Sequence, residues 1–227
     1  MSAKLRQFLS DTSGAAFVEM SLGISLLLLV VLGIIEFSYV FYQYNAADKA
    51  MQWAARVAAV SNPVASDLAN YTGLDSTHLP GDALPANAYD VTCQASDALG
   101  NSVSCTGTFT TADATAFKAL IYGRLPGGGA TTCNTSTAAQ TGEYPGARIG
   151  ICNYLRGIQA SNIVVRYQYT GLGYAGRPGG AVPSVTVSLR NMQYQYIFLG
   201  GFIGASTFNM PSFATTVTGE DLNSAGS

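Results

Sequence analysis

Charged side chains are scarce in this chain of 227 residues, and it has no block of basic residues. Asp, Glu, Lys and Arg together make up 11% of the sequence, whereas about 25% is typical of soluble domains. The net charge is −2. Because nucleic-acid-binding domains carry a basic patch or stripe, this composition argues against nucleic acid as a partner. It favours a chain that contacts a membrane and other apolar surfaces.

Residues suited to metal binding or acid–base chemistry are also few. The chain has one histidine, His78, which lies in a predicted turn before Pro80. The cysteines have neither CxxC spacing nor a nearby histidine, so zinc is not favoured. The glycines at 127–129 are not followed by the Lys-Ser/Thr pair of a phosphate-binding loop. We therefore expect no catalytic residues, no metal, no cofactor and no small-molecule substrate.

The sequence does contain one long apolar run. Residues 20–35 read MSLGISLLLLVVLGII and carry no charge. Counting back to Ala15 gives 21 residues, interrupted only by Glu19. A membrane-spanning helix needs about 20 apolar residues, so the run predicts a transmembrane helix over residues 15–36. A carboxylate in such a segment is costly and points to a function.

Two basic residues, Lys4 and Arg6, precede the apolar run. The positive-inside rule then predicts a cytoplasmic N-terminus and an exported C-terminal part. A cleaved secretory signal is the alternative, and it needs small residues after the run. The bulky sequence EFSYVFY stands there instead and suits a membrane interface. Glu36 begins this stretch, either at the outer interface or as a second buried ionisable group.

The helix is expected to continue beyond the membrane over residues 37–61. This segment has no Gly or Pro up to Asn62-Pro63, and alanine and other apolar residues recur in it at three- and four-residue spacing. Such spacing produces one apolar stripe on a helix. We expect the stripe to pack on a globular domain formed by residues 62–222.

That domain has the pattern of an α+β fold with a small antiparallel sheet. The predicted elements are a short helix at 65–71, a hairpin at 89–109, a helix at 112–122, strands within 163–170 and 182–198, and an extended segment at 208–218. A long loop is predicted from 125 to 148. The tail, residues 223–227, is expected to be disordered.

All four cysteines lie on the predicted exported side, where disulfides form readily. Cys93 and Cys105 stand on opposite arms of the predicted hairpin. The favoured pairing is therefore Cys93–Cys105, which leaves Cys133 with Cys152. Four cysteines allow two other pairings, and these stay open.

The N-terminal pattern resembles the processing site of type IV prepilins. Gly14-Ala15-Ala16-Phe17-Val18-Glu19 places a glutamate five residues after a glycine, directly before the apolar run. Together with the GIIEF sequence at 33–37, the alanine-rich stretch 46–56 and the pattern of residues 182–222, it is similar to TadE-like proteins, minor pseudopilins of tight-adherence (Tad/Flp) pili. TadF and more distant pseudopilins are alternatives within this group.

The resemblance implies a function and a processing step. A prepilin peptidase would cut between Gly14 and Ala15 and remove a cytoplasmic leader, residues 1–14. Glu19 would then meet the N-terminal amine of a neighbouring pilin subunit. The implied protein is a non-enzymatic, single-pass protein of the bacterial inner membrane with a periplasmic domain, which works in pilus assembly with other pilins or pseudopilins. An unassembled membrane adhesin or binding module is the alternative.

Overall fold

The computed structural model describes residues 13–125, 128–129, 132–133, 148–177, 181–204 and 206–219. Most of the predicted leader, most of the predicted loop 125–148 and the whole tail 223–227 lie outside the described residues. The chain divides into two compact units. The described residues of Met1–Tyr42 together with Tyr194–Phe208 form the first, here the stem unit. Gln43–Gln193 and Asn209–Ser227 contribute the second, here the sheet unit.

One helix, α2, runs from Ser13 to Ala59 and contributes to both units. Its 47 residues contain no proline and are rich in Leu and Ala, which are strong helix formers. The last turn closes with a hydrogen bond from Val60 N to Val57 O, and Asn62-Pro63 follows. Because the proline ring disfavours a helical residue before it, the helix stops here. The predicted single helix from Ala15 to about Val60 is confirmed.

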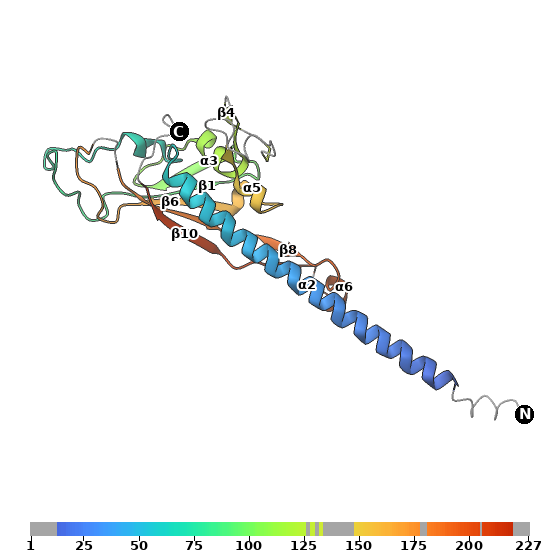
Figure 1. Cartoon of the computed structure of the whole chain (residues 1–227). Helices are drawn as coiled ribbons and strands as arrows, with labels where there is room; N and C mark the ends of the chain where they lie inside the picture. Colours follow the sequence, from blue (N-terminus) through green and yellow to red (C-terminus); the bar gives the residue numbers. More distant parts are fainter. Residues whose placement is uncertain are drawn as a thin grey trace, which may run out of the picture. The chain divides into compact units, whose positions relative to one another are not determined.

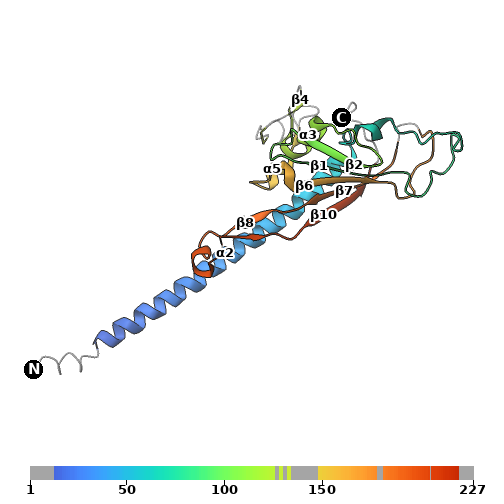
Figure 2. The same ribbon diagram turned by 180° about the vertical axis from the view of Figure 1, so that it is seen from behind.

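The sheet unit is built on a five-stranded sheet in the order β10-β7-β6-β1-β2. All neighbouring strands are antiparallel. The strands are β1 (Asp90–Ala95), β2 (Val103–Gly107), β6 (Ile163–Gln168), β7 (Ser184–Leu189) and β10 (Phe213–Thr218). Figures 1 and 2 show the second half of α2 running alongside this sheet. The predicted α+β class is confirmed.

The second half of α2 buries an alanine-rich stripe in the sheet unit. The stripe consists of Ala47, Ala50, Met51, Ala54, Ala55 and Ala58, each at most 4% exposed. Small side chains let a helix backbone approach its neighbour closely. Tyr44 packs edge-on against Phe213 of β10, with ring centroids 4.6 Å apart. The apolar spacing seen in the sequence therefore marks the face that meets the domain.

Shorter elements surround the sheet. They are η1 (Ser66–Asn70), α3 (Ala114–Tyr122), β3 (Gly123–Leu125), β4 (Gly128–Gly129), β5 (Arg148–Ile149), α5 (Ile151–Tyr154) and η2 (Ala160–Asn162). Asp113 caps α3, because its carboxylate accepts from Thr115 N at 2.7 Å and Ala116 N at 3.1 Å. The expected short helix, the hairpin and the helix predicted at 112–122 are all present.

The hydroxyl of Tyr167 ties the sheet to the segment that follows α2. Tyr167 is fully buried on β6 and accepts a hydrogen bond from Val64 N at 3.0 Å. Burial raises the pKa of this phenol, so the group stays neutral. A neutral, hydrogen-bonded hydroxyl avoids the cost of an unpaired polar group in the core.

Two disulfides join the four cysteines. Cys93 lies opposite Cys105 in the β1–β2 register and is bonded to it, with the Cα atoms 4.1 Å apart. Cys133 is bonded to Cys152 with a Cα separation of 5.8 Å. These are the pairs that the sequence favours. Each closes a short loop, and by the chain-entropy estimate such a bridge stabilises by roughly 3 kcal/mol.

Peptide mapping of the non-reduced protein is expected to recover both bridges. Trypsin cuts after Arg148, so Cys133 and Cys152 should appear in two peptides that separate only on reduction. An endoproteinase that cuts before Asp97 should give the same result for Cys93 and Cys105. Free thiols, or a peptide that links Cys93 to Cys133, would contradict this pairing.

Candidate functional site

The predicted processing motif lies at the start of α2. Gly14 and Glu19 are both exposed in its first turns. A Cβ atom built on Gly14 meets nothing within 4 Å. The fold therefore does not require a glycine here, because the position is helical and open. A requirement for glycine at residue 14 would therefore come from another protein that binds this segment.

The helix after this motif presents apolar side chains to its surroundings. Phe17, Leu22, Leu26 and Ile34 are each more than 60% exposed. An 18-residue window of α2 reaches a mean hydropathy of 2.5, and within the described residues α2 is the helix that is long and apolar enough to cross a membrane. Soluble proteins rarely expose so large a continuous apolar surface. The stem unit thus offers a candidate membrane span.

At the far end of this apolar stretch, Glu36 is almost fully buried, with 2% exposure. The residues that cover it come from the C-terminal part of the stem unit. Its carboxylate accepts a hydrogen bond from the Tyr194 hydroxyl at 2.6 Å. It also accepts from three backbone N–H groups: Ile197 at 2.9 Å, Phe198 at 2.7 Å and Leu199 at 3.4 Å. We call this arrangement the Glu36 clamp.

The comparison with protein families adds an observation on this helix. Residues 14–56 match the family described as TadE-like protein. The helix carries a TadE-like domain. The matched segment begins at Gly14 and ends three residues before the end of α2. No curated protein and no solved structure matched the chain.

The Glu36 clamp fastens the TadE-like helix to a hairpin outside the matched segment. Strands β8 (Gln193–Gln195) and β9 (Thr207–Asn209) form this hairpin, and α6 (Gly200–Ile203) lies between them. Figures 1 and 2 show the hairpin and α6 beside the helix. Backbone N–H groups pointing at a carboxylate give charge-assisted hydrogen bonds, which are stronger than neutral ones. The clamp therefore joins the two parts of the stem unit through four donors on one carboxylate.

Tyr194 is kept in the protonated form that the clamp needs. Burial, and then its hydrogen bond to Glu36, raise the pKa of this phenol above its ordinary value. Its ring also packs against Tyr39 at 5.9 Å and Phe208 at 5.2 Å between centroids. The hydroxyl is thus held in place as a donor by the aromatic rings around it.

The sequence is compatible with two positions for Glu36, and it does not identify the partners of this carboxylate. The clamp shows that protein groups bury this carboxylate. Its donors are 158 to 163 residues away along the chain. One sequence pattern hints at the segment that covers Glu36. No charged residue stands between Arg190 and Glu220, and tyrosine and phenylalanine are frequent there.

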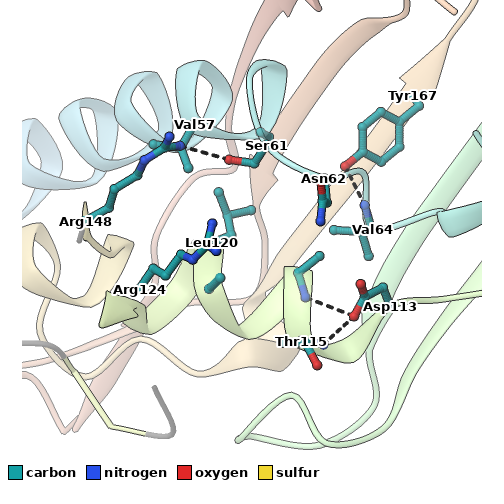
Figure 3. Close-up of a pocket in the computed structure, with 13 residues that line it drawn as sticks. Val57, Ser61, Asn62, Val64, Asp113, Thr115, Leu120, Arg124, Arg148 and Tyr167 are labelled. Atoms are coloured by element: carbon teal, nitrogen blue, oxygen red, sulfur yellow. Dashed lines mark hydrogen bonds between the residues drawn. The ribbon is translucent and has the colours of Figure 1, made fainter. Parts of the chain in front are cut away.

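A pocket of about 170 Å³ lies in the sheet unit, between the end of α2 and the start of α3. Figure 3 shows the Arg148 side chain pointing toward Ser61, near Val57. Nη1 of Arg148 donates to the Ser61 hydroxyl oxygen at 3.1 Å. Asp113 caps α3, and Tyr167 holds Val64 N. These polar groups already make structural hydrogen bonds. Among the described residues that line the pocket there is no histidine, cysteine or lysine.

The single histidine does not line this pocket and sits in a turn that is mostly exposed. Its Nδ1 atom is 2.9 Å from the Asp75 carboxylate. Hydrogen bonds from Thr77 and then His78 hold the pKa of Asp75 well below its usual range. The Asp75 side chain thus closes its own turn, which is a structural use of these residues. Within the described residues, no group of three or more His, Cys, Asp or Glu could hold a metal ion.

Proposed function

We propose that this chain is a minor pseudopilin of a Tad-type adhesive pilus, anchored in the bacterial inner membrane. The observation that carries the proposal is the TadE-like match, which begins at Gly14, includes Glu19 five residues later and lies on a helix that exposes an apolar surface over the next turns. Processing after Gly14 would leave Ala15 as the first residue. The helix would then pack among other pilin helices.

The dimensions of the helix fit this role. From Ala15 to Glu36 the helix rises about 32 Å, at ~1.5 Å per residue. The hydrocarbon core of a bilayer is about 30 Å thick. The span would therefore end near Glu36, and the sheet unit would lie outside the membrane. The two disulfides support an oxidising compartment such as the periplasm for that unit.

Glu19 is the residue expected to set the register between subunits. A carboxylate inside the membrane is costly unless it meets a cation. After processing, the basic residues of the leader are gone, and the Ala15 amine remains at the same depth. Ala15 and Glu19 are four residues apart on a helix and so lie on one face. The glutamate of one subunit can pair with its own amine or with that of a neighbour.

A Glu19→Ala variant tests the proposal. We expect it to insert normally, because the change makes the span more apolar, and to lose most of its co-purification with partner pilins. Glu19→Gln should behave in the same way, whereas Glu19→Asp should retain part of the association. Met20→Ala, which trims an exposed neighbour without removing a charge, is the matched control.

Membrane fractionation and co-purification must be measured on the same preparations. Normal association of both Glu19→Ala and Glu19→Gln would show that Glu19 is no assembly contact. Failure of the wild-type chain itself to co-purify with any pilin would instead fit the alternative of an unassembled membrane adhesin or binding module. Loss of the variant from the membrane fraction would contradict the role assigned to the apolar helix.

A further inference from the structure

The clamped hairpin ends in a loop with an unusual surface. We call residues 196–204 the tip segment. Three of its side chains are exposed although they are large and apolar: Ile197 by 54%, Phe198 by 42% and Phe202 by 72%. No charged residue lies within it or within several residues on either side. An exposed, uncharged loop that bears two phenylalanines is the kind of apolar surface that marks an interaction site.

Five of the nine backbone N–H groups of the tip segment donate to an acceptor within the stem unit. Ile197, Phe198 and Leu199 donate their N–H groups to Glu36. Tyr196 N donates to Ser206 O at 3.1 Å, and Phe202 N donates to Leu199 O at 2.9 Å. In contact with lipid, an unsatisfied backbone group costs several kcal/mol. These five hydrogen bonds lower the cost of bringing the main chain of the segment close to lipid.

The clamp also fixes where the tip segment lies along the helix. Glu36 is about 32 Å from Ala15 along α2, at ~1.5 Å per residue, which is close to the thickness of the hydrocarbon core. Tyr39, Tyr194 and Tyr196 surround the clamp, with Tyr194 and Tyr196 5.8 Å apart between ring centroids. Tyrosines of this kind are enriched where a membrane meets water.

We propose that the tip segment is a second membrane contact of this protein, in which Phe198 and Phe202 enter the interface of the outer leaflet beside the helix. The proposal rests on the membrane span assigned to α2. The occupant is lipid because the segment is continuous with the apolar surface of the span. It offers no charge with which to select a protein partner. The stem unit would then contact the membrane through both the span and the tip segment.

Fluorescence quenching by brominated lipid tests this contact. The only tryptophan, Trp53, is replaced by phenylalanine, and one tryptophan is introduced into the full-length chain in phosphatidylcholine vesicles. The three positions are Phe202 in the tip segment, Leu27 at the middle of the span and Leu79 in the sheet unit. All three are more than half exposed, so each substitution is well tolerated by packing.

We expect bromolipid to reduce the emission at positions 202 and 27 and to leave position 79 unchanged. Bromine placed near the headgroups should quench position 202 more strongly than bromine deep in the acyl chain, and position 27 should show the reverse order.

Quenching at 27 with none at 202 would overturn the tip contact and leave the span intact. Blue-shifted but unquenched emission at 202 would indicate a second copy as the partner, which also overturns it. Absence of quenching at 27 would remove the span itself.

Discussion

A Gly14→Leu variant is expected to accumulate uncleaved in the membrane, heavier than the wild-type protein by the whole predicted leader. The reason is external to the fold. Gly14 is exposed and helical, and a side chain there would meet no neighbour within 4 Å. Leucine is also a better helix former than glycine, by somewhat under 1 kcal/mol. The chain should therefore fold and insert, while the peptidase fails to accept a bulky residue at its cutting position.

Intact mass and N-terminal sequencing of protein extracted from membranes of a peptidase-competent cell measure this effect. Wild type should begin at Ala15. Gly23→Leu is the matched control, because that glycine is also helical with open space around it, and it should be processed normally. The assignment fails if Gly14→Leu is still cut, or if the wild-type protein begins at Met1 or Ser2.

Features with a local pattern could be predicted from the sequence. The helix, and the hairpin with Cys93 and Cys105, each depend on residues that are close together in the sequence. The strand order β10-β7-β6-β1-β2 could not be predicted, because it depends on pairing between segments far apart in the sequence. The packing of residues 194–208 with the first part of the helix could not be predicted for the same reason, because these segments are far apart in the sequence.

The Glu36 clamp illustrates the limit most clearly. Three of its four donors are backbone N–H groups. Every residue except proline has a backbone N–H group, so the sequence does not show which of these groups will bind the carboxylate. The sequence could show that Glu36 follows an apolar run and therefore needs an explanation. It could not show whether water, lipid headgroups or protein would surround the carboxylate.

We expect a Glu36→Ala variant to open the β8–β9 hairpin away from the helix. Removing the carboxylate leaves the Tyr194 hydroxyl and the N–H groups of residues 197–199 without their acceptor. A buried donor without a partner costs about 1–3 kcal/mol. The loss should appear as local opening of Tyr194–Phe208, because stability is not uniform across a structure. The sheet unit should keep its unfolding transition.

Limited chymotrypsin digestion of the detergent-solubilised protein measures this opening, because Tyr196, Phe198 and Phe202 are cleavage sites inside the hairpin. When opening is fast, cleavage follows the population of the open form, and a loss of ~1.4 kcal/mol raises that population tenfold. We expect at least this acceleration for Glu36→Ala and a smaller one for Glu36→Gln, which keeps one acceptor oxygen. Asp48→Ala, at an exposed position of the same helix, should digest like wild type. Cleavage of Glu36→Ala at the wild-type rate would show that Glu36 does not fasten the hairpin to the helix.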